Sequence, residues 1–329
     1  MKKLLAFALI CVLSLALLAG CGAAPSAPSA PSTQEGNQTT FKIGLLQLVE
    51  HPSLDEISAA IQSELTAKAA EQGLAITVDY QNAQNDMSTI STICQQYVAD
   101  QVDLIIAIAT PAAQGAAAAV DGTEIPVIFS AVTDPVAAEL VDSLAAPGGN
   151  ITGTSDAIPV EKIFALAEEL TPKVKSYGLI YSTSEVNSVS VIEQAKAYLD
   201  GKGIAYTEGA VTTTGDVQIS AQNLLSKCDA IFAPIDNTVA SAMTVLAEEG
   251  IKAGKPVYVS ADSMVADGGL ATVGINYTNL GTQTADMAMK VLTGTKPADI
   301  PVEVLKDNAV VVNTDTAAAL KVDVSKYAA

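Results

Sequence analysis

The sequence predicts an α/β protein with two lobes of the same topology, joined by three crossings of the chain that together form a hinge. From residue 41 onward, amphipathic stretches alternate with short apolar runs, which is typical of doubly wound parallel sheets. The run over residues 104–109 is apolar throughout, as in a parallel strand that is buried on both faces. Short motifs of the first half recur in the same order in the second half.

The first elements after residue 41 show the helical periodicity and then the strand periodicity. Apolar residues recur with helical spacing until Gly73, a residue type that commonly ends helices. An alternation of apolar and polar residues follows and predicts a strand. The helical positions are Leu54, Ile57, Ile61, Leu65 and Ala69, and the strand positions are Ile76, Val78 and Tyr80.

Four pairs of motifs indicate that the two halves share one topology. A single pair would mean little, because Gly and Pro recur at turns for local reasons. Four pairs in one order indicate a repeated arrangement whose period is too long for a solenoid. The pairs are 44–46 with 178–180, 103–106 with 229–232, 126–131 with 256–261, and 148–149 with 268–269.

The joins between the lobes follow from the order of the elements. Residues 148–155 leave the first lobe, and Pro159 then opens a helix, a position that suits proline. Residues 273–277 leave the second lobe before a helix over 280–292, and a last strand over 309–313 precedes a short helix. We therefore place the first lobe at residues 41–155 plus 277–305, and the second at 156–276 plus 306–329.

Residues 1–20 have the pattern of a secretory signal peptide that ends in a lipobox. Lys2 and Lys3 precede an apolar run over residues 4–18, which is shorter than the roughly 20 residues that span a bilayer. Small residues then precede Cys21, which we expect to be acylated and to hold the protein on the outer face of the cell membrane. Residues 21–40 are rich in Ala, Pro and Ser, which predicts an extended tether.

The composition excludes several classes of protein. Of 329 residues, 49% are hydrophobic, which is ample for two cores, and the formal net charge is −19. The sequence contains neither arginine nor tryptophan, so an acidic chain without guanidinium groups is not expected to bind nucleic acid. Cys94 and Cys228 fall in different predicted lobes, and we expect two buried free thiols. We also expect a monomer.

Catalysis is not expected. His51 is the only histidine, and it follows Glu50 and precedes Pro52 at the predicted start of a helix. A catalytic triad would have to use this residue. Metal-ligand spacings of the Cys-x-x-Cys and His-Glu-x-x-His kinds are absent, as are Walker and Gly-x-Gly-x-x-Gly loops. The sequence therefore predicts a binding protein without a cofactor or a metal.

Polar residues stand at the predicted carboxyl ends of the strands, where ligands gather in parallel α/β sheets. Helix capping is an equal alternative for Thr110, Ser130, Asp236 and Asn237. None of these residues is basic, so backbone N–H groups, hydroxyls and helix dipoles would have to hold an anionic ligand group. Asp236 and Asp262 suit an ammonium group, which suggests a zwitterionic amino acid. The candidate ligand-binding residues are Gln47, Thr110, Ser130, Ala131, Thr133, Ser155, Asn187, Asp236, Asn237 and Asp262.

Seven motifs are spread over the chain: KIGLLQLVEHP at 42–52, DYQNAQ at 79–84, AIATP at 107–111, FSAVTDP at 129–135, GTSD at 153–156, SEVNS at 184–188 and PIDNT at 234–238. Together they resemble the ABC-transporter substrate-binding proteins of the tryptophan/tyrosine type, over residues 41 to about 323. The resemblance implies the type I periplasmic-binding-protein fold, with two Rossmann-like lobes and three hinge segments. It also implies delivery of the solute to a membrane permease with a cytoplasmic ATPase.

The resemblance further implies how a ligand would be held. The ligand carboxylate would contact Thr110 and the turn over residues 131–133, and the ammonium would contact Asp262, with Asp236 as the second choice. An aromatic L-amino acid is the expected ligand, with Phe129, Tyr181 and Phe232 near the predicted strand ends. The alternatives are another amino acid, a sugar or nucleoside-type solute, or a lipid-anchored sensor that feeds a membrane kinase.

Overall fold

The computed structural model describes residues 39–306 and 308–327. The predicted signal peptide, Cys21 and all of the predicted tether up to residue 38 lie outside the described residues. Over the described ranges, no helix combines the length and the apolar character needed to cross a bilayer.

The first lobe is built on a six-stranded sheet in the order β11-β5-β4-β3-β1-β2. Each pair of neighbouring strands in it is parallel. Its elements are β1 (Thr40–Gln47), α1 (Pro52–Gln72), β2 (Ala75–Asn82), α2 (Met87–Ala99), β3 (Leu104–Ile108), α3 (Thr110–Val120), β4 (Val127–Ser130), β5 (Ile151–Ser155), α10 (Tyr277–Leu292), η2 (Pro297–Asp299) and β11 (Glu303–Val304).

The second lobe is built on a six-stranded sheet in the corresponding order β12-β10-β9-β8-β6-β7. Its elements are α4 (Val160–Leu170), β6 (Ser176–Ser182), α5 (Val186–Lys202), β7 (Ala205–Val211), η1 (Thr214–Asp216), α6 (Val217–Leu225), β8 (Ala230–Ala233), α7 (Asn237–Ala240), α8 (Met243–Ala253), β9 (Val257–Val259), α9 (Asp262–Ala266), β10 (Ala271–Gly274), β12 (Ala309–Val312) and α11 (Thr314–Leu320).

The predicted α/β fold with two lobes of one topology is confirmed. The first five strands of each sheet follow the 2-1-3-4-5 order of doubly wound folds. The last strands differ, because β11 is parallel to β5 whereas β12 is antiparallel to β10. The chain passes between the two sheets three times, after β5, after β10 and between β11 and β12. The division of the chain at the residues given above stays a prediction.

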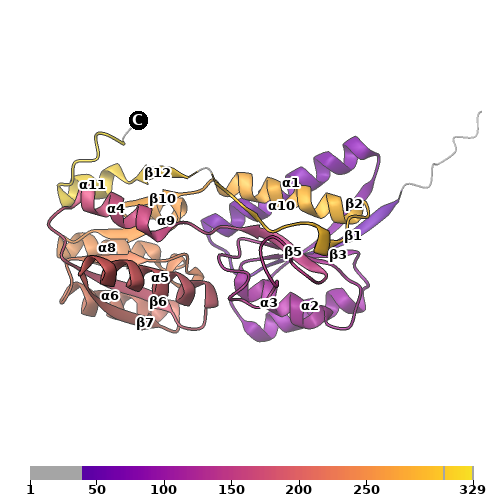
Figure 1. The fold of residues 1–329 in the computed structure, drawn as a ribbon, viewed down its shortest axis with the longest axis horizontal. Helices are drawn as coiled ribbons and strands as arrows, with labels where there is room; N and C mark the ends of the chain where they lie inside the picture. The colour runs from indigo at the N-terminus through magenta and orange to yellow at the C-terminus, as the bar shows by residue number, and fades with distance from the viewer. Residues whose placement is uncertain (1–38, 307, 328–329) are drawn as a thin grey trace, which may run out of the picture. The chain divides into compact units, whose positions relative to one another are not determined.

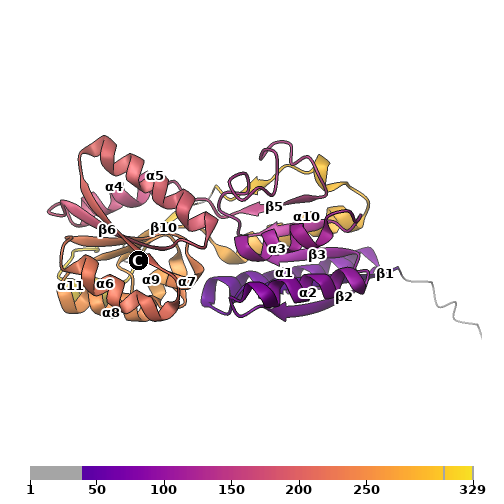
Figure 2. The ribbon, with the colours of Figure 1, turned by 90° about the horizontal axis from the view of Figure 1, so that it is seen from below.

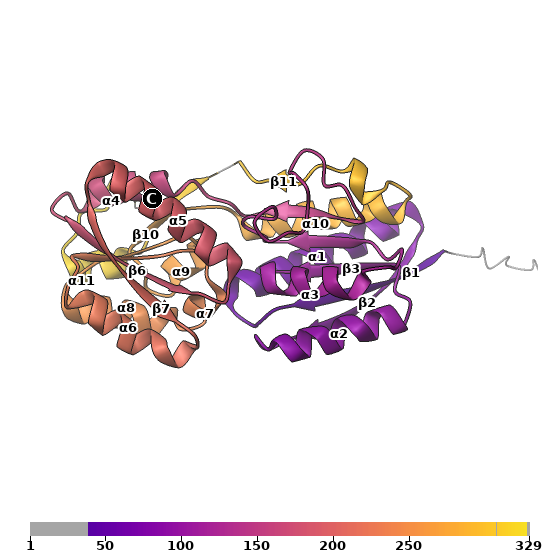
Figure 3. The ribbon, with the colours of Figure 1, turned by 60° about the horizontal axis from the view of Figure 1, so that its bottom comes forward.

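Helices cover both faces of each sheet. In Figure 1, α1 and α10 lie side by side on one face of the first sheet, and α2 and α3 lie on the other. Figure 2 shows α4 and α5 on one face of the second sheet and α6 and α8 on the opposite face. Short β11 lies beside β5 at the edge of the first sheet (Figure 3). These layers leave the carboxyl ends of the strands as the open edge of each lobe.

Two element boundaries differ from the prediction, both because of an asparagine cap. The helix expected over 280–292 begins at Tyr277, since the Asn276 side chain accepts the N–H of Asn279 at 2.7 Å. The strand expected over 309–313 ends at Val312, since Asn313 caps α11 by accepting the N–H of Thr316 at 2.9 Å. Asparagine favours such N-cap positions.

The predicted free thiols are confirmed for Cys94 and Cys228, which are both buried and unpaired. Burial raises the pKa of the Cys94 thiol to about 12, so this cysteine is an unreactive core residue. Neither residue lies near the carboxyl ends of the strands, since Cys94 belongs to α2 and Cys228 precedes β8.

The glycines that open the two halves have matching structural reasons. A Cβ atom on Gly44 would lie 2.5 Å from the ring of Tyr97, whose hydroxyl donates to the carbonyl of Asp79 at 2.9 Å. A Cβ atom on Gly178 would lie 2.8 Å from the Cβ of Leu224 on α6. At both positions a helix packs directly on the backbone of a central strand. The repeated motif therefore reflects helix-to-sheet packing.

We predict that Gly44→Ala lowers the free energy of unfolding by about 1–3 kcal/mol, the usual cost of an overpacked core. Urea denaturation of the purified lobes measures this change. Gly149→Ala is the matched control, because no atom lies within 4 Å of the added Cβ. Equal stability of Gly44→Ala and the wild-type protein would contradict the packing described here.

Candidate functional site

A small cavity of about 20 Å³ lies where the carboxyl ends of the strands of both lobes meet. Its position is the one expected for a ligand site in open α/β sheets. The lining combines apolar side chains with buried polar ones. The lining residues are His51, Ser53, Leu54, Ala131, Asp156, Asn187, Ile235, Asp236, Asn237, Ala240, Ala261, Met264 and Tyr277.

Four of the candidate residues from the sequence line this cavity, namely Ala131, Asn187, Asp236 and Asn237. Asp236 is also the N-cap of α7, where it accepts the N–H of Val239 at 2.8 Å and the N–H of Ser182 at 2.6 Å. The capping interpretation of Asp236 is therefore confirmed, and its carboxylate borders the cavity as well. Asn237 is the first residue of α7 and does not cap it.

Thr133 and Ser155 do not line the cavity, but they position a residue that does. The Thr133 hydroxyl donates to Oδ1 of Asp156 at 2.8 Å. The Ser155 hydroxyl donates to the carbonyl of Thr133 at 3.0 Å, which ties the turn after β4 to the end of β5. These two hydroxyls hold the Asp156 carboxylate at the cavity wall.

The other four candidates also lie outside the cavity lining. Gln47 donates to Oδ1 of Asp55 at 2.6 Å, and Ser130 shares a hydrogen bond of 2.8 Å with the Thr284 hydroxyl of α10. Asp262 accepts the N–H of Ser263 at 2.8 Å, next to the lining residue Ala261. Ser130 ends β4 and caps no helix, so its capping interpretation is wrong.

Thr110 does not cap a helix either. It is the first residue of α3, the N-cap is Ala109, and the buried Thr110 hydroxyl has no hydrogen-bond partner. Ala109 and Ala131 follow neighbouring strands and have left-handed backbones, with φ of 81° and 55°. Such conformations cost of order 1 kcal/mol and occur preferentially at binding sites.

Two buried carboxylic acids border the cavity, one from each half of the chain. Burial raises the pKa of Asp156 to about 6. Burial, and then the negative charge of Glu185, raises the pKa of Asp236 to about 7. No lysine is among the lining residues that the structure describes. Charged carboxylates at this site are therefore stabilised by hydrogen bonds alone and by no lysine of the lining.

Glu185 organises the second-lobe wall of the cavity. Its carboxylate accepts the N–H and the side-chain amide of Asn237 at 3.1 and 2.6 Å. It also accepts the N–H and the hydroxyl of Thr238, both at 3.0 Å. These bonds fix the first turn of α7, including the orientation of the Asn237 amide.

His51 connects the two lobes across the cavity. Its Nε2 lies 3.1 Å from Oδ1 of Asn237, whereas its Nδ1 is buried without a partner. Burial lowers the pKa of the imidazole. The hydrogen bond to Asn237 raises this pKa, but its effect is smaller than that of burial. His51 precedes α1 at the N-cap position, but its side chain makes no capping bond. The sequence placed His51 at the start of a helix, which is correct, but it did not predict the contact between His51 and Asn237.

Further hydrogen bonds between the lobes surround the cavity. The Ser190 hydroxyl of α5 donates to Oδ2 of Asp134 at 2.7 Å. The Asn85 amide donates to the Thr238 hydroxyl at 3.4 Å, and the hydroxyls of Ser53 and Ser263 also contact each other. The two lobes are thus in direct contact at several points besides the one between His51 and Asn237.

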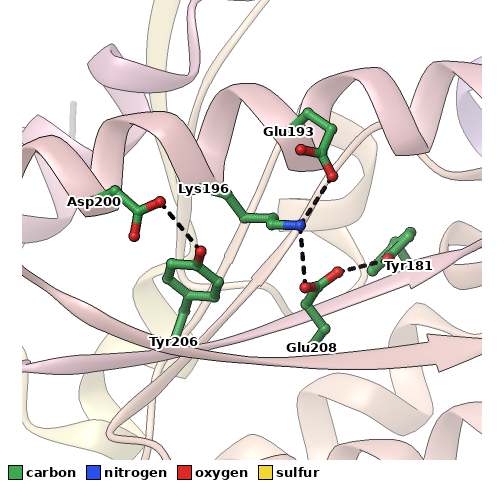
Figure 4. Close-up of polar contacts among 6 residues, drawn as sticks. All are labelled: Tyr181, Glu193, Lys196, Asp200, Tyr206 and Glu208. Carbon is green, nitrogen blue, oxygen red and sulfur yellow. Dashed lines mark hydrogen bonds and ion pairs between the residues drawn. The ribbon is translucent and has the colours of Figure 1, made fainter.

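The aromatic residues expected near the ligand lie elsewhere. Phe129 and Phe232 are fully buried in the cores of their lobes. Figure 4 shows Tyr181 in a polar network on the β6–β7 surface, where its hydroxyl donates to Glu208 at 2.7 Å. Lys196 bridges Glu208 at 3.2 Å and Glu193 at 2.9 Å in the same network. The aromatic ring at the cavity is that of Tyr277, at the start of α10.

Asp156, His51 and Glu185 lie at or beside the cavity but were not among the candidate residues from the sequence. Asp156 directly follows β5 and so had the same signal as Asp236, a carboxylate at the end of a strand. His51 and Glu185 also follow strands, β1 and β6, but the sequence could not predict their contacts with Asn237, which is more than 50 residues away along the chain.

Comparison with known proteins gives a consistent result. The family profile described as ABC transporter substrate binding protein matches residues 42–328. A tyrosine-binding protein of Clostridioides difficile is 38% identical over 329 residues, which cover 100% of this chain and 94% of the relative. An uncharacterized protein of Rickettsia prowazekii is 25% identical over 83% of this chain and 82% of its own.

Two solved structures are similar over most of the chain. The ABC domain in complex with L-Trp from Streptococcus pneumonia is 42% identical, with a TM-score of 0.83, and covers 88% of this chain and 99% of its own. The ligand-free, open structure of a substrate binding protein with adhesive properties from Clostridium difficile is 40% identical, with a TM-score of 0.67, and covers 86% and 95%. At nearly equal identity, the structure thus resembles the ligand-bound relative more closely than the open one.

We predict that the buried acids make the unliganded protein less stable at neutral pH than in mild acid. Native Asp156 and Asp236 have pKa values of about 6 and about 7, above the ordinary value of 3.8. The native state therefore binds more protons than the unfolded state in this range, and these groups reduce stability as the pH rises from about 4 to about 7. Urea denaturation near pH 5 and about pH 7.5 measures the effect.

Comparison with variants isolates this effect from His51, whose lowered pKa acts in the opposite direction. Asp156→Asn should lose part of the pH dependence and be more stable than the wild-type protein near pH 7.5. Asp121→Asn, at an exposed aspartate, is the control and should match the wild-type curve. An Asp156→Asn variant with the wild-type pH dependence would show that this carboxyl is not the cause.

Proposed function

Because the chain belongs to the family of ABC transporter substrate-binding proteins, we propose that it captures a zwitterionic aromatic L-amino acid in this cavity. It is a solute-binding protein of an ABC transporter, and members of this family bind their solute without catalysing a reaction. The names of its relatives support an aromatic ligand, since one is a tyrosine-binding protein and another was crystallised with L-Trp.

The single observation that carries the proposal is the pair of buried carboxylic acids, Asp156 and Asp236, at a cavity lined by no lysine among the described residues. A buried charge is stable only when it is paired and hydrogen-bonded. The α-ammonium of an amino acid supplies one positive charge and three N–H donors. We therefore assign the ammonium to Asp156 and Asp236, and Asp262 remains a candidate because it lies beside the lining residue Ala261.

The rest of the lining suits the other parts of an aromatic amino acid. Two long helices, α1 and α5, begin at the cavity, and helix N-termini attract carboxylates through their free N–H groups. The apolar side chains of Leu54, Ile235 and Met264 offer a surface for a ring. A methionine thioether also makes favourable contacts with aromatic rings.

We further propose that the protein is a lipoprotein, acylated at Cys21 and held on the extracytoplasmic face of the cell membrane. The basic residues, apolar run and lipobox of residues 1–21 support this assignment. From there the protein would deliver its ligand to an ABC permease. The predicted tether over residues 21–40 would leave the binding lobes free to reach that permease.

We predict that L-tyrosine and L-tryptophan bind the purified lobes and raise the melting temperature. At a 100-fold excess over the dissociation constant, the gain in free energy of unfolding is about 2.7 kcal/mol. Asp156→Asn should weaken binding at least about 25-fold, because losing one partner of a buried charge pair costs about 2 kcal/mol or more. Calorimetric titration of both proteins provides the measurement.

Asp262→Asn is the matched control for the assignment of the ammonium. If Asp262→Asn loses more affinity than Asp156→Asn, the ammonium lies beside α9. A parallel panel of the other amino acids, adenosine and arabinose covers the alternative solutes. Flat melting curves for every amino acid would refute the proposed ligand class.

A further inference from the structure

The hydrogen bonds around His51 determine which of its ring nitrogens carries the proton. The side-chain amide of Asn237 donates through Nδ2 to Oε2 of Glu185 at 2.6 Å. A carboxylate can only accept, so this contact fixes the orientation of the amide and leaves Oδ1 facing His51. Oδ1 is an acceptor, so Nε2 of His51, at 3.1 Å, must be the donor. The neutral imidazole therefore has a bare lone pair on Nδ1.

That lone pair is buried without a partner in the described part of the chain. His51 is 7% exposed and lines the cavity, and its Nδ1 has no hydrogen-bond partner among the described residues. A buried acceptor without a partner is costly, and such atoms commonly mark a place where a ligand binds. Burial also disfavours the charged imidazolium, which keeps Nδ1 an acceptor.

Asn187 offers a second free acceptor, at a different part of the wall. Its Nδ2 donates to the carbonyl of Ile235 at 2.8 Å, which leaves its buried Oδ1 without a partner. Asn187 also contacts Glu185 and, like Asp236, lines the second-lobe side of the cavity. We group it with the acceptors available to the ammonium.

His51 and Asp156 are held by different contacts. Nε2 of His51 lies 3.1 Å from Oδ1 of Asn237 at the start of α7, whereas Asp156, after β5, accepts the hydroxyl of Thr133 at 2.8 Å. With the ammonium assigned to Asp156, Nδ1 of His51 is available to another part of the ligand.

We propose that Nδ1 of His51 accepts a hydrogen bond from the ligand's side chain. The cavity then selects aromatic amino acids whose ring carries a donor, the O–H of tyrosine or the N–H of tryptophan, over phenylalanine. This inference rests on the proposed function. The physical reason is that phenylalanine would exclude water from Nδ1 and leave the acceptor buried and unpaired.

The first test compares aromatic amino acids with and without a hydrogen-bond donor on the side chain. Calorimetric titration with L-tyrosine, L-tryptophan, L-phenylalanine and O-methyl-L-tyrosine separates size from hydrogen bonding, because O-methyl-L-tyrosine keeps the phenolic oxygen without its proton. We expect phenylalanine and O-methyl-L-tyrosine to bind at least about 10-fold more weakly than tyrosine. Equal affinities for tyrosine and phenylalanine would overturn this inference and leave the proposed function intact, whereas no binding of any amino acid would refute both.

The second test uses His51→Leu, which removes the acceptor. The ratio of the phenylalanine to the tyrosine dissociation constant should fall toward one, mainly through loss of tyrosine affinity. The ratio cancels any general damage to the site. Thr272→Val is the matched control, because the Thr272 hydroxyl is also buried without a partner but lies outside the cavity lining. An unchanged ratio in His51→Leu would overturn the inference.

The third test needs no variant, since His51 is the only histidine in the chain. In ¹⁵N nuclear magnetic resonance of the imidazole, the free protein should show the neutral form protonated at Nε2. Adding tyrosine should shift the Nδ1 resonance in the direction of an accepted hydrogen bond, and adding phenylalanine should not. Protonation of Nδ1 on ligand binding would show that His51 instead contacts the ligand's carboxylate, and would overturn the inference.

Discussion

Buried negative charge without a buried positive partner is the constraint around which this site is arranged. Asp156 and Asp236 are each about 1% exposed at a cavity that no lysine lines within the described part of the chain. The sequence contains no arginine at all. Hydrogen bonds from Thr133 to Asp156, and from two backbone N–H groups to Asp236, lower the cost of this arrangement without removing it. In the function proposed above, the ammonium group of a ligand supplies the missing positive charge.

The duplicated topology explains why both halves of the chain contribute to one cavity. In each lobe the first five strands of the sheet run parallel, so the loops after them gather at one edge, and helices begin there. The two edges face the same cavity, and contacts such as His51 to Asn237 and Ser190 to Asp134 join them. The cavity takes its lining from both edges, so the candidate residues form one site only when both edges are present.

The fold could be predicted from the sequence because local patterns of apolar residues and glycines determine its helices and strands. The apolar runs, the helical stripe ending at Gly73 and the matched glycines at 44 and 178 all record packing within one lobe. The positions of Asp236 and Asn237 at the cavity could also be predicted, since the ends of strands and the starts of helices can be recognised in a sequence. Their chemistry could be expected from position alone.

The remainder of the site depends on contacts that no local pattern encodes. The role of His51 follows from Asn237, whose orientation follows from Glu185 in a third segment of the chain. Tyr181 is similarly placed at a strand end, yet its hydroxyl contacts Glu208 on the neighbouring strand, and Tyr181 is not among the residues that line the cavity. Whether a polar residue after a strand binds a ligand or supports a neighbour is thus decided by tertiary packing.

Proton release on ligand binding tests the central claim most directly. Calorimetric titration with L-tyrosine near pH 6.5, in buffers of different ionisation enthalpy, measures the number of protons exchanged. Unliganded Asp156 and Asp236, with pKa values of about 6 and about 7, are partly protonated there, and a bound ammonium should displace those protons into the buffer. A binding enthalpy that is the same in every buffer, or an uptake of protons, would contradict the account.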